Sequence, residues 1–206
     1  MTFKWCQMFA KDDASVVEDT PVFEGFFTLR RLTVRHKRFA GGDMTVTREL
    51  FVRGPAVCVL LYDPQRDNVV MVEQFRIGAL EHRNGPWMLE LVAGIIEPAE
   101  TPEAVARREA EEESGVALGE LIPITRYLPS PGGSNEEIHL FCAFVDSENA
   151  GGLHGLESEG EDIKVHVLPC EQLFAMVKTG QIDNAATIIA LQWLQLNQAE
   201  LKQRSS

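Results

Sequence analysis

Residues 94–116 read GIIEPAETPEAVARREAEEESGV, and this stretch decides the fold. It begins with a glycine after an apolar segment and continues through a loop into a helix with clear limits. Thr101 is a suitable N-cap, Pro102 suits the first helical position, and Gly115 suits the position just past the last turn. The sequence therefore predicts a helix from about Pro102 to Ser114.

Three glutamates of this helix share one side. Glu109, Glu112 and Glu113 stand at i, i+3 and i+4, so their carboxylates crowd one another. Like charges at this spacing destabilise a helix unless a cation neutralises them, and hard divalent cations bind carboxylate oxygens. A glutamate-rich helix is usually only a solvated face. Here, however, the glutamates belong to the longer pattern G-x5-E-x7-R-E-x-x-E-E-x-G, in which two glycines, a further glutamate and an arginine also stand at fixed positions. We therefore predict that this helix holds a magnesium site for phosphates.

The composition and charge of the chain disfavour several other classes of protein. The chain has 206 residues, 45% of them hydrophobic, which predicts one globular domain or a domain with an appended subdomain. A net charge of -12 disfavours nucleic-acid binding. Because no segment approaches the roughly 18 apolar residues of a membrane span, we expect a cytoplasmic protein without a membrane partner. Four cysteines (Cys6, Cys58, Cys142, Cys170) lack Cys-x-x-Cys spacing and are expected to be reduced, buried thiols.

Strand patterns flank the predicted helix on both sides. Residues 26–51 favour two strands around the glycine-rich turn Gly41-Gly42-Asp43, which is typical of a β-hairpin in an N-terminal β subdomain. The C-terminal part favours two helices, the last at about 185–202, after an irregular acidic segment at 146–162. Such a mixture predicts a mixed sheet covered by helices. The other expected strands are 56–62, 69–75, 87–93, 121–128, 138–145 and 163–168.

The quoted pattern matches the Nudix box at every fixed position, with one mild departure at Ala99, where many members carry glycine. Other stretches resemble the bacterial ADP-ribose pyrophosphatases of this superfamily. The resemblance implies an α/β (α+β) fold: a Nudix α/β/α sandwich with a mixed sheet at 54–206, and an N-terminal antiparallel β subdomain at 1–53 that forms the dimer. The stretches that carry it are Gly25-Phe26-Phe27, Arg48-Glu49, Glu73-Gln74-Phe75-Arg76, Pro86-Trp87, Ser130-Pro131-Gly132-Gly133, Glu161-Asp162-Ile163, 182–186 and 190–194.

The resemblance also implies a reaction: magnesium-dependent hydrolysis of ADP-ribose to AMP and ribose 5-phosphate. Two or three Mg²⁺ ions are expected, with Mn²⁺ as an alternative ion. Arg108 is expected to be structural, and Glu159 is the candidate that deprotonates or orients the attacking water. The implied metal ligands are Glu109, Glu113, the backbone carbonyl of Ala93, Glu161 from the acidic segment, and Glu112 as a ligand or a close neighbour of one.

The implied substrate contacts are more widely spread along the chain. The subfamily resemblance implies a homodimer in which the N-terminal subdomain crosses to the partner, so that Phe26, Arg48 and Arg53 reach the site of the other chain. The contacts are Arg48, Arg53 and Arg76 for phosphates or ribose, Phe26 or Phe27 for adenine, Ser130, Pro131 and Gly132 with Glu136 for the terminal ribose, and additionally Glu49 and Ile95.

Two other functions remain open at this point. A Nudix enzyme for another nucleoside diphosphate sugar would keep the same metal helix and differ around Ser130 to Glu136. A non-catalytic Nudix domain that senses a ligand usually loses carboxylates of the box, whereas this chain keeps them. A calcium-binding structural protein is disfavoured because no EF-hand loop of the D-x-D-x-D-G type is present.

Overall fold

The structure is a computed structural model and describes residues 5–205. It divides into two compact units. One unit holds the residues up to Gly54 together with Ser130–Glu136, and the other holds Pro55–Pro129 and the residues from Glu137 onward. The first unit thus takes in a short segment, 130–136, that is distant in the sequence.

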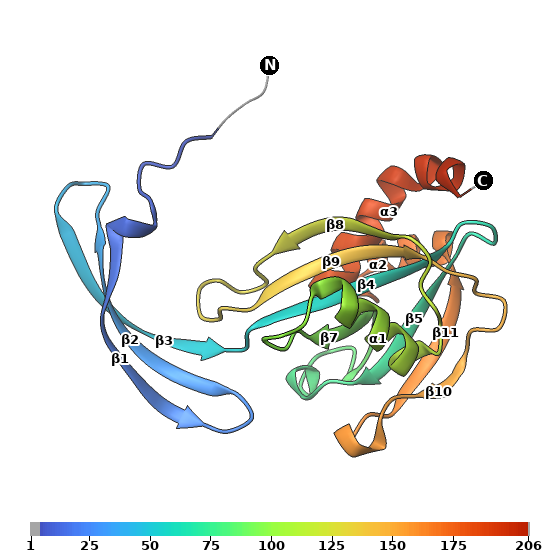
Figure 1. Ribbon diagram of the computed structural model, residues 1–206, viewed down its shortest axis with the longest axis horizontal. Helices are drawn as coiled ribbons and strands as arrows, with labels where there is room; N and C mark the ends of the chain where they lie inside the picture. The colour runs from blue at the N-terminus through green and yellow to red at the C-terminus, as the bar shows by residue number, and fades with distance from the viewer. Residues whose placement is uncertain (1–4, 206) are drawn as a thin grey trace. The chain divides into compact units, whose positions relative to one another are not determined.

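The first unit is a three-stranded antiparallel sheet in the order β1-β2-β3 (Figure 1), with β1 at Ala14–Glu24, β2 at Thr28–Lys37 and β3 at Asp43–Val52. A short 3-10 helix, Lys11–Asp13, precedes β1. The expected hairpin is confirmed, because β2 and β3 pair without a break from Thr28↔Val52 to Lys37↔Asp43. Gly41 and Gly42 turn the chain with positive φ angles of 88° and 74°, a conformation that favours glycine.

The second unit contains an eight-stranded mixed sheet in the order β10-β11-β5-β4-β9-β8, with β6 paired to β5 and β7 paired to β4. The central strands β4 and β9 run parallel, and the other neighbours run antiparallel. The bounds are β4 Pro55–Asp63, β5 Asn68–Phe75, β6 Trp87–Glu90, β7 Val92–Ile95, β8 Leu121–Tyr127, β9 Glu137–Phe144, β10 Gly152–His154 and β11 Ile163–Pro169.

Two expectations about this sheet need correction. Residues 87–93 do not form one strand, because the chain leaves β5 after Glu90 and pairs with β4 from Val92 onward. The acidic segment 146–162 is not wholly irregular, since it contains β10 and a 3-10 helix, η3, at Glu157–Glu159. In the first case the deciding interaction is pairing with strands far away in sequence, and in the second β10 pairs with the nearby strand β11.

Helices cover both faces of this sheet, so the expected α/β/α sandwich is confirmed (Figure 1). The helices are α1 Pro102–Ser114, α2 Cys170–Thr179 and α3 Ala185–Arg204. Alternate residues of β4 divide the core, as a strand with two buried faces requires. Leu60 and Tyr62 pack in the cluster of α2 and α3, whereas Val59 and Leu61 pack in the cluster of α1.

Helix α1 begins and ends where the sequence predicts. The Thr101 side chain accepts a hydrogen bond from the backbone N–H of Ala104, and Pro102 occupies the first turn. Gly115 ends the helix with φ 67°, and its N–H donates to the carbonyls of Ala110 and Glu111. These local interactions fix the start and the end of the helix that carries Glu109 to Glu113.

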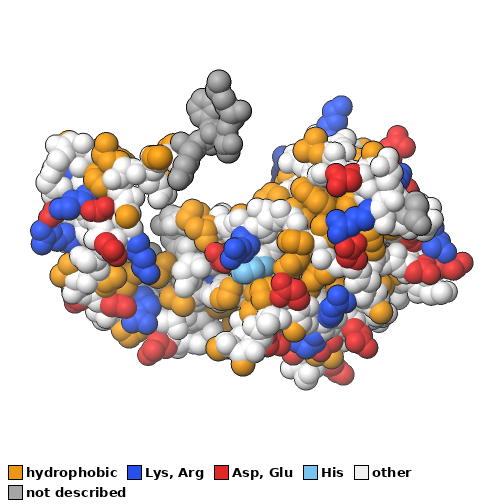
Figure 2. Space-filling view, turned by 45° about the horizontal axis from the view of Figure 1, so that its top comes forward, with side chains coloured by type: hydrophobic (Ala, Val, Ile, Leu, Met, Phe, Trp, Pro, Cys, Tyr) orange, Lys and Arg blue, Asp and Glu red, His pale blue; other side chains and the backbone are white. Residues whose placement is uncertain are grey.

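None of the four cysteines, all within the described residues, forms a disulfide; Cys58, Cys142 and Cys170 are buried as expected, but Cys6 is exposed. None of the helices within residues 5–205 has the length and apolar character needed to cross a bilayer. On the face shown in Figure 2, basic and acidic side chains of the described residues are interspersed rather than gathered by sign.

Candidate metal and phosphate site

The glutamates of α1 differ sharply in their surroundings. Glu113 is 2% exposed, and its Oε2 accepts a hydrogen bond of 3.0 Å from the backbone N–H of Ala93. Burial raises the pKa of Glu113 to about 8, and burial raises the pKa of Glu109 to about 7. A buried carboxyl and a half-buried one, both with raised pKa values, favour the binding of a proton or a cation.

Gly94 makes room for one of these carboxylates. A Cβ built on Gly94 would lie 2.0 Å from Oε1 of Glu109, far inside van der Waals contact. Any larger residue at position 94 must therefore displace Glu109. This close approach explains why a glycine stands at this position of β7, the strand before the loop that leads to α1.

Arg108 binds three carboxylates, two on α1 and one in the loop before it. Its Nη1 lies 2.9 Å from Oε1 of Glu109 and 3.0 Å from Oε2 of Glu112, and its Nε lies 3.5 Å from Oε1 of Glu100. Glu100 in turn accepts a hydrogen bond from the N–H of Glu97, which closes the loop before α1. These contacts support a structural role for Arg108.

The acidic loop between β10 and β11 brings another carboxylate to the same helix. The N–H of Gly155 donates to the carbonyl of Glu112 at 3.3 Å, which ties the loop to α1. The charge of Glu161 contributes to the raised pKa values of both Glu109 and Glu113, after the larger effect of burial. Glu159 lies in η3 and is exposed. The structure thus brings Glu161 to the helix but leaves Glu159 in solvent.

In this conformation, no group of three potential metal-ligating side chains among residues 5–205 has its ligand atoms assembled. The carboxylates instead hold other partners: Arg108 for Glu109 and Glu112, the N–H of Ala93 for Glu113, and the N–H of Leu156 for Glu161. The set of donors nevertheless fits a hard divalent cation, because it consists of oxygens and concentrates negative charge in a poorly solvated place. Turning these side chains toward one another is the change that a bound cation requires.

Arg76 provides positive charge beside the carboxylates. Its Nε donates to Oε2 of Glu90 at 2.7 Å, and the Arg76 charge opposes the rise in the pKa of Glu113. Glu90 was not among the residues singled out from the sequence. It comes from β6, and only the register of β6 on β5 places it here. Ile95, the last residue of β7, is 37% exposed.

Several of the expected substrate contacts gather within the first unit. The guanidinium of Arg53 lies 4.8 Å above the ring of Phe27, and its Nε lies 3.1 Å from Oε1 of Glu136. Phe26 is 87% exposed and packs edge-on against Phe27, with ring centroids 4.7 Å apart. Asn135, which the sequence analysis missed, accepts a hydrogen bond from the N–H of Arg53. An exposed aromatic ring beside an arginine suits a nucleobase and an anionic group.

The remaining residues of this unit are less closely associated. Arg48 and Glu49 are neighbours on β3 and therefore point to opposite faces of the sheet. Glu49 lies 3.7 Å from Arg31, and Arg48 donates to the carbonyl of Thr47. Ser130, Pro131 and Gly132 belong to a turn in which the carbonyl of Ser130 accepts from Gly133 and Ser134.

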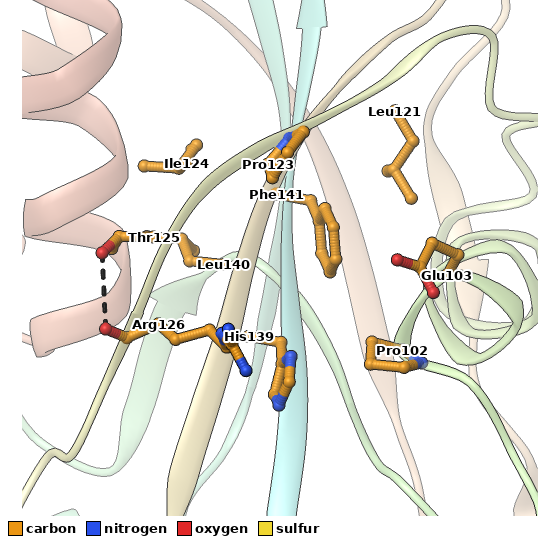
Figure 3. A pocket seen from close by; sticks show the side chains of 10 residues that line it. All are labelled: Pro102, Glu103, Leu121, Pro123, Ile124, Thr125, Arg126, His139, Leu140 and Phe141. Carbon is orange, nitrogen blue, oxygen red and sulfur yellow. Dashed lines mark hydrogen bonds between the residues drawn. The ribbon is translucent and has the colours of Figure 1, made fainter.

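A cavity of about 430 Å³ lies elsewhere in the second unit, beside β8, β9 and the start of α1. Figure 3 shows apolar side chains such as Leu121 and Phe141 in its wall, together with Arg126 and His139. His139 pairs with Glu137 at 3.0 Å. None of the site residues expected from the sequence lines this cavity, so it is separate from the carboxylates of α1.

Comparison with known proteins agrees with this geometry. Residues 52–192 match the model of the NUDIX domain family. The chain is 49% identical over 201 residues to the ADP-ribose pyrophosphatase of Haemophilus influenzae, covering 96% of this chain and 93% of that protein. It is 36% identical over 182 residues to the GDP-mannose pyrophosphatase of Citrobacter koseri, covering 87% of this chain and 94% of that protein.

A solved structure, described as an ADP compounds hydrolase, superimposes with a TM-score of 0.66 over 89% of this chain and 95% of its own, at 17% identity, which shows a shared fold. The chain is thus an α/β/α sandwich with carboxylates on the helix that follows β7. The chain belongs to the NUDIX domain family.

Proposed function

We propose that this chain is a Nudix pyrophosphohydrolase that cleaves ADP-ribose to AMP and ribose 5-phosphate and depends on a divalent metal. The observation that carries the proposal is the pair of carboxyls of Glu109 and Glu113 on one side of α1, where Glu113 is 2% exposed, the Glu109 side chain is 13% exposed, and burial raises the pKa of both. The relative from Haemophilus influenzae, matched over nearly the whole of both chains, is named an ADP-ribose pyrophosphatase, which supports this substrate.

The residues that would hold the metal are Glu109, Glu113 and Glu161, with Glu112 and the carbonyl of Ala93 close by. We propose Mg²⁺, as two or three ions, with Mn²⁺ as an alternative. When bound, the ions neutralise the diphosphate oxygens and acidify water. The buried position of Glu113 and its hydrogen bond from Ala93 orient one carboxylate before any ion arrives.

Other side chains would then bind and orient the substrate. Arg76 is placed to pair with the diphosphate, because its 41% exposed side chain lies beside the carboxylates and forms its ion pair with Glu90 alone among the described residues. Glu159 would take a proton from the attacking water or orient it, as a carboxylate on a loop that is already tied to α1 through Gly155. Ile95 would border the substrate at the end of β7.

We propose that the remaining contacts involve a homodimer with exchanged N-terminal subdomains, in which Phe26, Arg48 and Arg53 reach the site of the partner chain. The grouping of Phe26, Phe27, Arg53 and Glu136 within one unit supports a surface for adenine and ribose. The residues of this proposed surface are Phe26, Phe27, Arg48, Glu49, Arg53, Ser130, Pro131, Gly132 and Glu136. A cytoplasmic location is part of the proposal, since buried cysteines without disulfides suit a reducing compartment.

The alternative substrate is another nucleoside diphosphate sugar. A specific observation favours it as the second candidate: the relative from Citrobacter koseri, at 36% identity, is named a GDP-mannose pyrophosphatase. Both substrates need the same carboxylates and differ in the base and in the terminal sugar. The lower identity places this alternative behind ADP-ribose.

Chromatography of the products tests the proposal. Wild type and Glu113→Gln are incubated with ADP-ribose, ADP-glucose and GDP-mannose, each with Mg²⁺ and with chelator. With wild type we expect AMP to appear fastest from ADP-ribose and only with metal, and we expect Glu113→Gln to lose this turnover. The control Glu111→Gln, whose side chain is exposed on the same helix, should retain the wild-type rate. Faster release of GMP from GDP-mannose would favour the alternative, and no turnover of any substrate would favour a ligand sensor.

A further inference from the structure

Within residues 5–205, two side-chain polar atoms are buried without a hydrogen-bond partner: Nε2 of Gln74 and Oγ1 of Thr187. Gln74 is 6% exposed and stands near the end of β5. A buried amide donor without an acceptor is costly, because it has lost its bonds to water and gained none in return. Such a donor is explained if another state of the protein supplies an acceptor.

The register of the sheet identifies the nearest candidate acceptor. Gln74 stands opposite Met88, and Val72 stands opposite Glu90. Residues directly opposite in an antiparallel pair share a face, so Gln74 and Glu90 share the face of α1, where Val72 packs. Their positions are diagonal, and a diagonal neighbour lies within reach of a long side chain. Glutamine and glutamate are long enough to meet there.

Glu90 already has a partner that is needed elsewhere. Its Oε2 accepts from Nε of Arg76 at 2.7 Å, and its side chain is only 16% exposed. If Arg76 turns to a diphosphate, the Glu90 carboxylate remains in a poorly solvated place without its charged donor. A buried carboxylate that loses its partner is strongly destabilised, so the movement of Arg76 would be opposed.

We propose that Gln74 is a positioning residue that donates to Glu90 when Arg76 leaves that carboxylate for the diphosphate of the substrate. This inference rests on the proposed function, because it takes a diphosphate as the ligand of Arg76. The amide of Gln74 replaces one hydrogen bond of the departing guanidinium. Nε2 of Gln74, which has no partner in the unliganded protein, then has the carboxylate of Glu90 as its acceptor in the liganded protein.

The test removes the donor and keeps the volume. In Gln74→Met we expect the Kd for non-hydrolysable α,β-methylene ADP-ribose, measured by calorimetry with Mg²⁺, to rise about tenfold, the value of one hydrogen bond to a charged group. The KM for ADP-ribose should rise similarly with little change in kcat. The melting temperature should stay the same or increase, because an unsatisfied buried donor has been removed.

Two comparisons separate partner exchange from a general packing effect. In an Arg76→Ala background, Gln74→Met should cause no further rise in Kd, because there is no longer an arginine to release. The matched control is Thr187→Val, which removes the other buried unpartnered atom from α3 and should leave Kd and KM unchanged. If Gln74→Met does not fold, Gln74→Leu carries the same expectations.

Specific results overturn the inference. An unchanged Kd and KM in Gln74→Met, with a wild type that hydrolyses ADP-ribose, leaves the proposed function standing and removes the role of Gln74. A rise in Kd of the same size in the Arg76→Ala background shows that Gln74 acts independently of Arg76 and also overturns it. A wild type that neither binds the analogue nor hydrolyses ADP-ribose refutes the proposed function and, with it, the exchange of partners.

Discussion

Gly94 is the position at which the smallest change should reach the candidate metal site. The Cβ of Gly94→Ala would lie 2.3 Å from Cδ and 2.4 Å from Cγ of Glu109, so the glutamate must move while the backbone stays in place. Because displacements of about 1 Å can cost about 100-fold in rate, we expect turnover to fall by about that factor with little loss of stability. Steady-state kinetics and thermal melting measure both. Gly78→Ala is the control, since no atom lies within 4 Å of its added Cβ, and equal losses in both variants would contradict the argument.

Glu113 should show opposite effects on stability and activity. The substitution Glu113→Gln would keep an acceptor for the N–H of Ala93 but remove a carboxyl whose burial raises its pKa to about 8. In chelator we expect the free energy of unfolding of this variant to rise by on the order of 1–3 kcal/mol, so that it melts at a higher temperature. We also expect it to lose most of its metal-dependent turnover. Glu111→Gln should match wild type in both assays. A lower melting temperature for Glu113→Gln in chelator would show that the charge is well compensated.

At the residue scale, the sequence was informative where the relevant spacing is local. Glu109, Glu112 and Glu113 could be grouped because i, i+3 and i+4 on a helix determine their side. Glu90 and Gln74 could not, since their roles depend on the register between β5 and β6, which 11 intervening residues from Arg76 to Pro86 leave open. Gly94 could be recognised as a fixed position of the pattern, but its close neighbour, the side chain of Glu109, came only from the structure.

The acidic loop is the element that should separate a catalytic carboxylate from a merely solvated one. Glu157 and Glu159 are the first and last residues of η3, and both are exposed, so neither is needed for packing. We expect Glu159→Gln to lower kcat by about 100-fold or more and to remove the acidic limb of the pH–rate profile, as loss of a general base does. Glu157→Gln is the matched control from the same turn and should retain both. Equal retention of activity in the two variants would move the role of base to another residue.

Elements were predictable to the extent that local interactions define them. Helix α1 begins and ends as expected because a cap, a proline and a glycine mark its limits. The division of 87–93 into β6 and β7 was missed because each half pairs with a different, distant strand. Strand β1 was missed because all of its residues are exposed, so its sequence lacks the alternation of a half-buried strand.

For the molecule as a whole, the raised pKa values of Glu109 and Glu113 should make the stability of the metal-free protein depend on pH. Below about pH 4.5 both carboxyls are protonated in the folded and the unfolded chain, so they cost nothing. As the pH rises, the unfolded chain ionises first, whereas Glu109 and Glu113 keep their protons until about pH 7 and 8. The folded state then binds more protons, so the free energy of unfolding should decrease between pH 5 and 8.

Urea unfolding at several pH values, in chelator and in Mg²⁺, measures this slope. Mg²⁺ should flatten it by neutralising the ionised pair, and Glu113→Gln should make it shallower in chelator. Asp63 does not interfere: burial raises its pKa, but hydrogen bonds from Ser147 and from the backbone outweigh burial and lower the pKa to about 2, below this window. A free energy of unfolding that increases from pH 5 to 8 in chelator would show that Glu109 and Glu113 ionise without difficulty.

The proposed exchange of N-terminal subdomains makes a prediction about mixtures of inactive chains. Glu113→Gln loses the metal site of its own chain, and the double variant Phe26→Ala/Arg48→Ala loses side chains that we propose act in the partner. Phe26 is 87% exposed and Arg48 donates to the carbonyl of the adjacent Thr47, so the double variant should fold. In a mixed dimer, the intact Glu113 of one chain meets the intact Phe26 and Arg48 of the other, and one complete site forms.

Equal amounts of the two variants, allowed to exchange chains, should therefore recover about a quarter of wild-type activity, since about half of the dimers are mixed and each has one complete site of two. Each variant mixed with itself is the control and should stay inactive. Sedimentation checks that dimers form in every sample. If dimers form and the mixture remains as inactive as its components, the N-terminal residues serve the site of their own chain, because then each mixed dimer would carry one defect in each site.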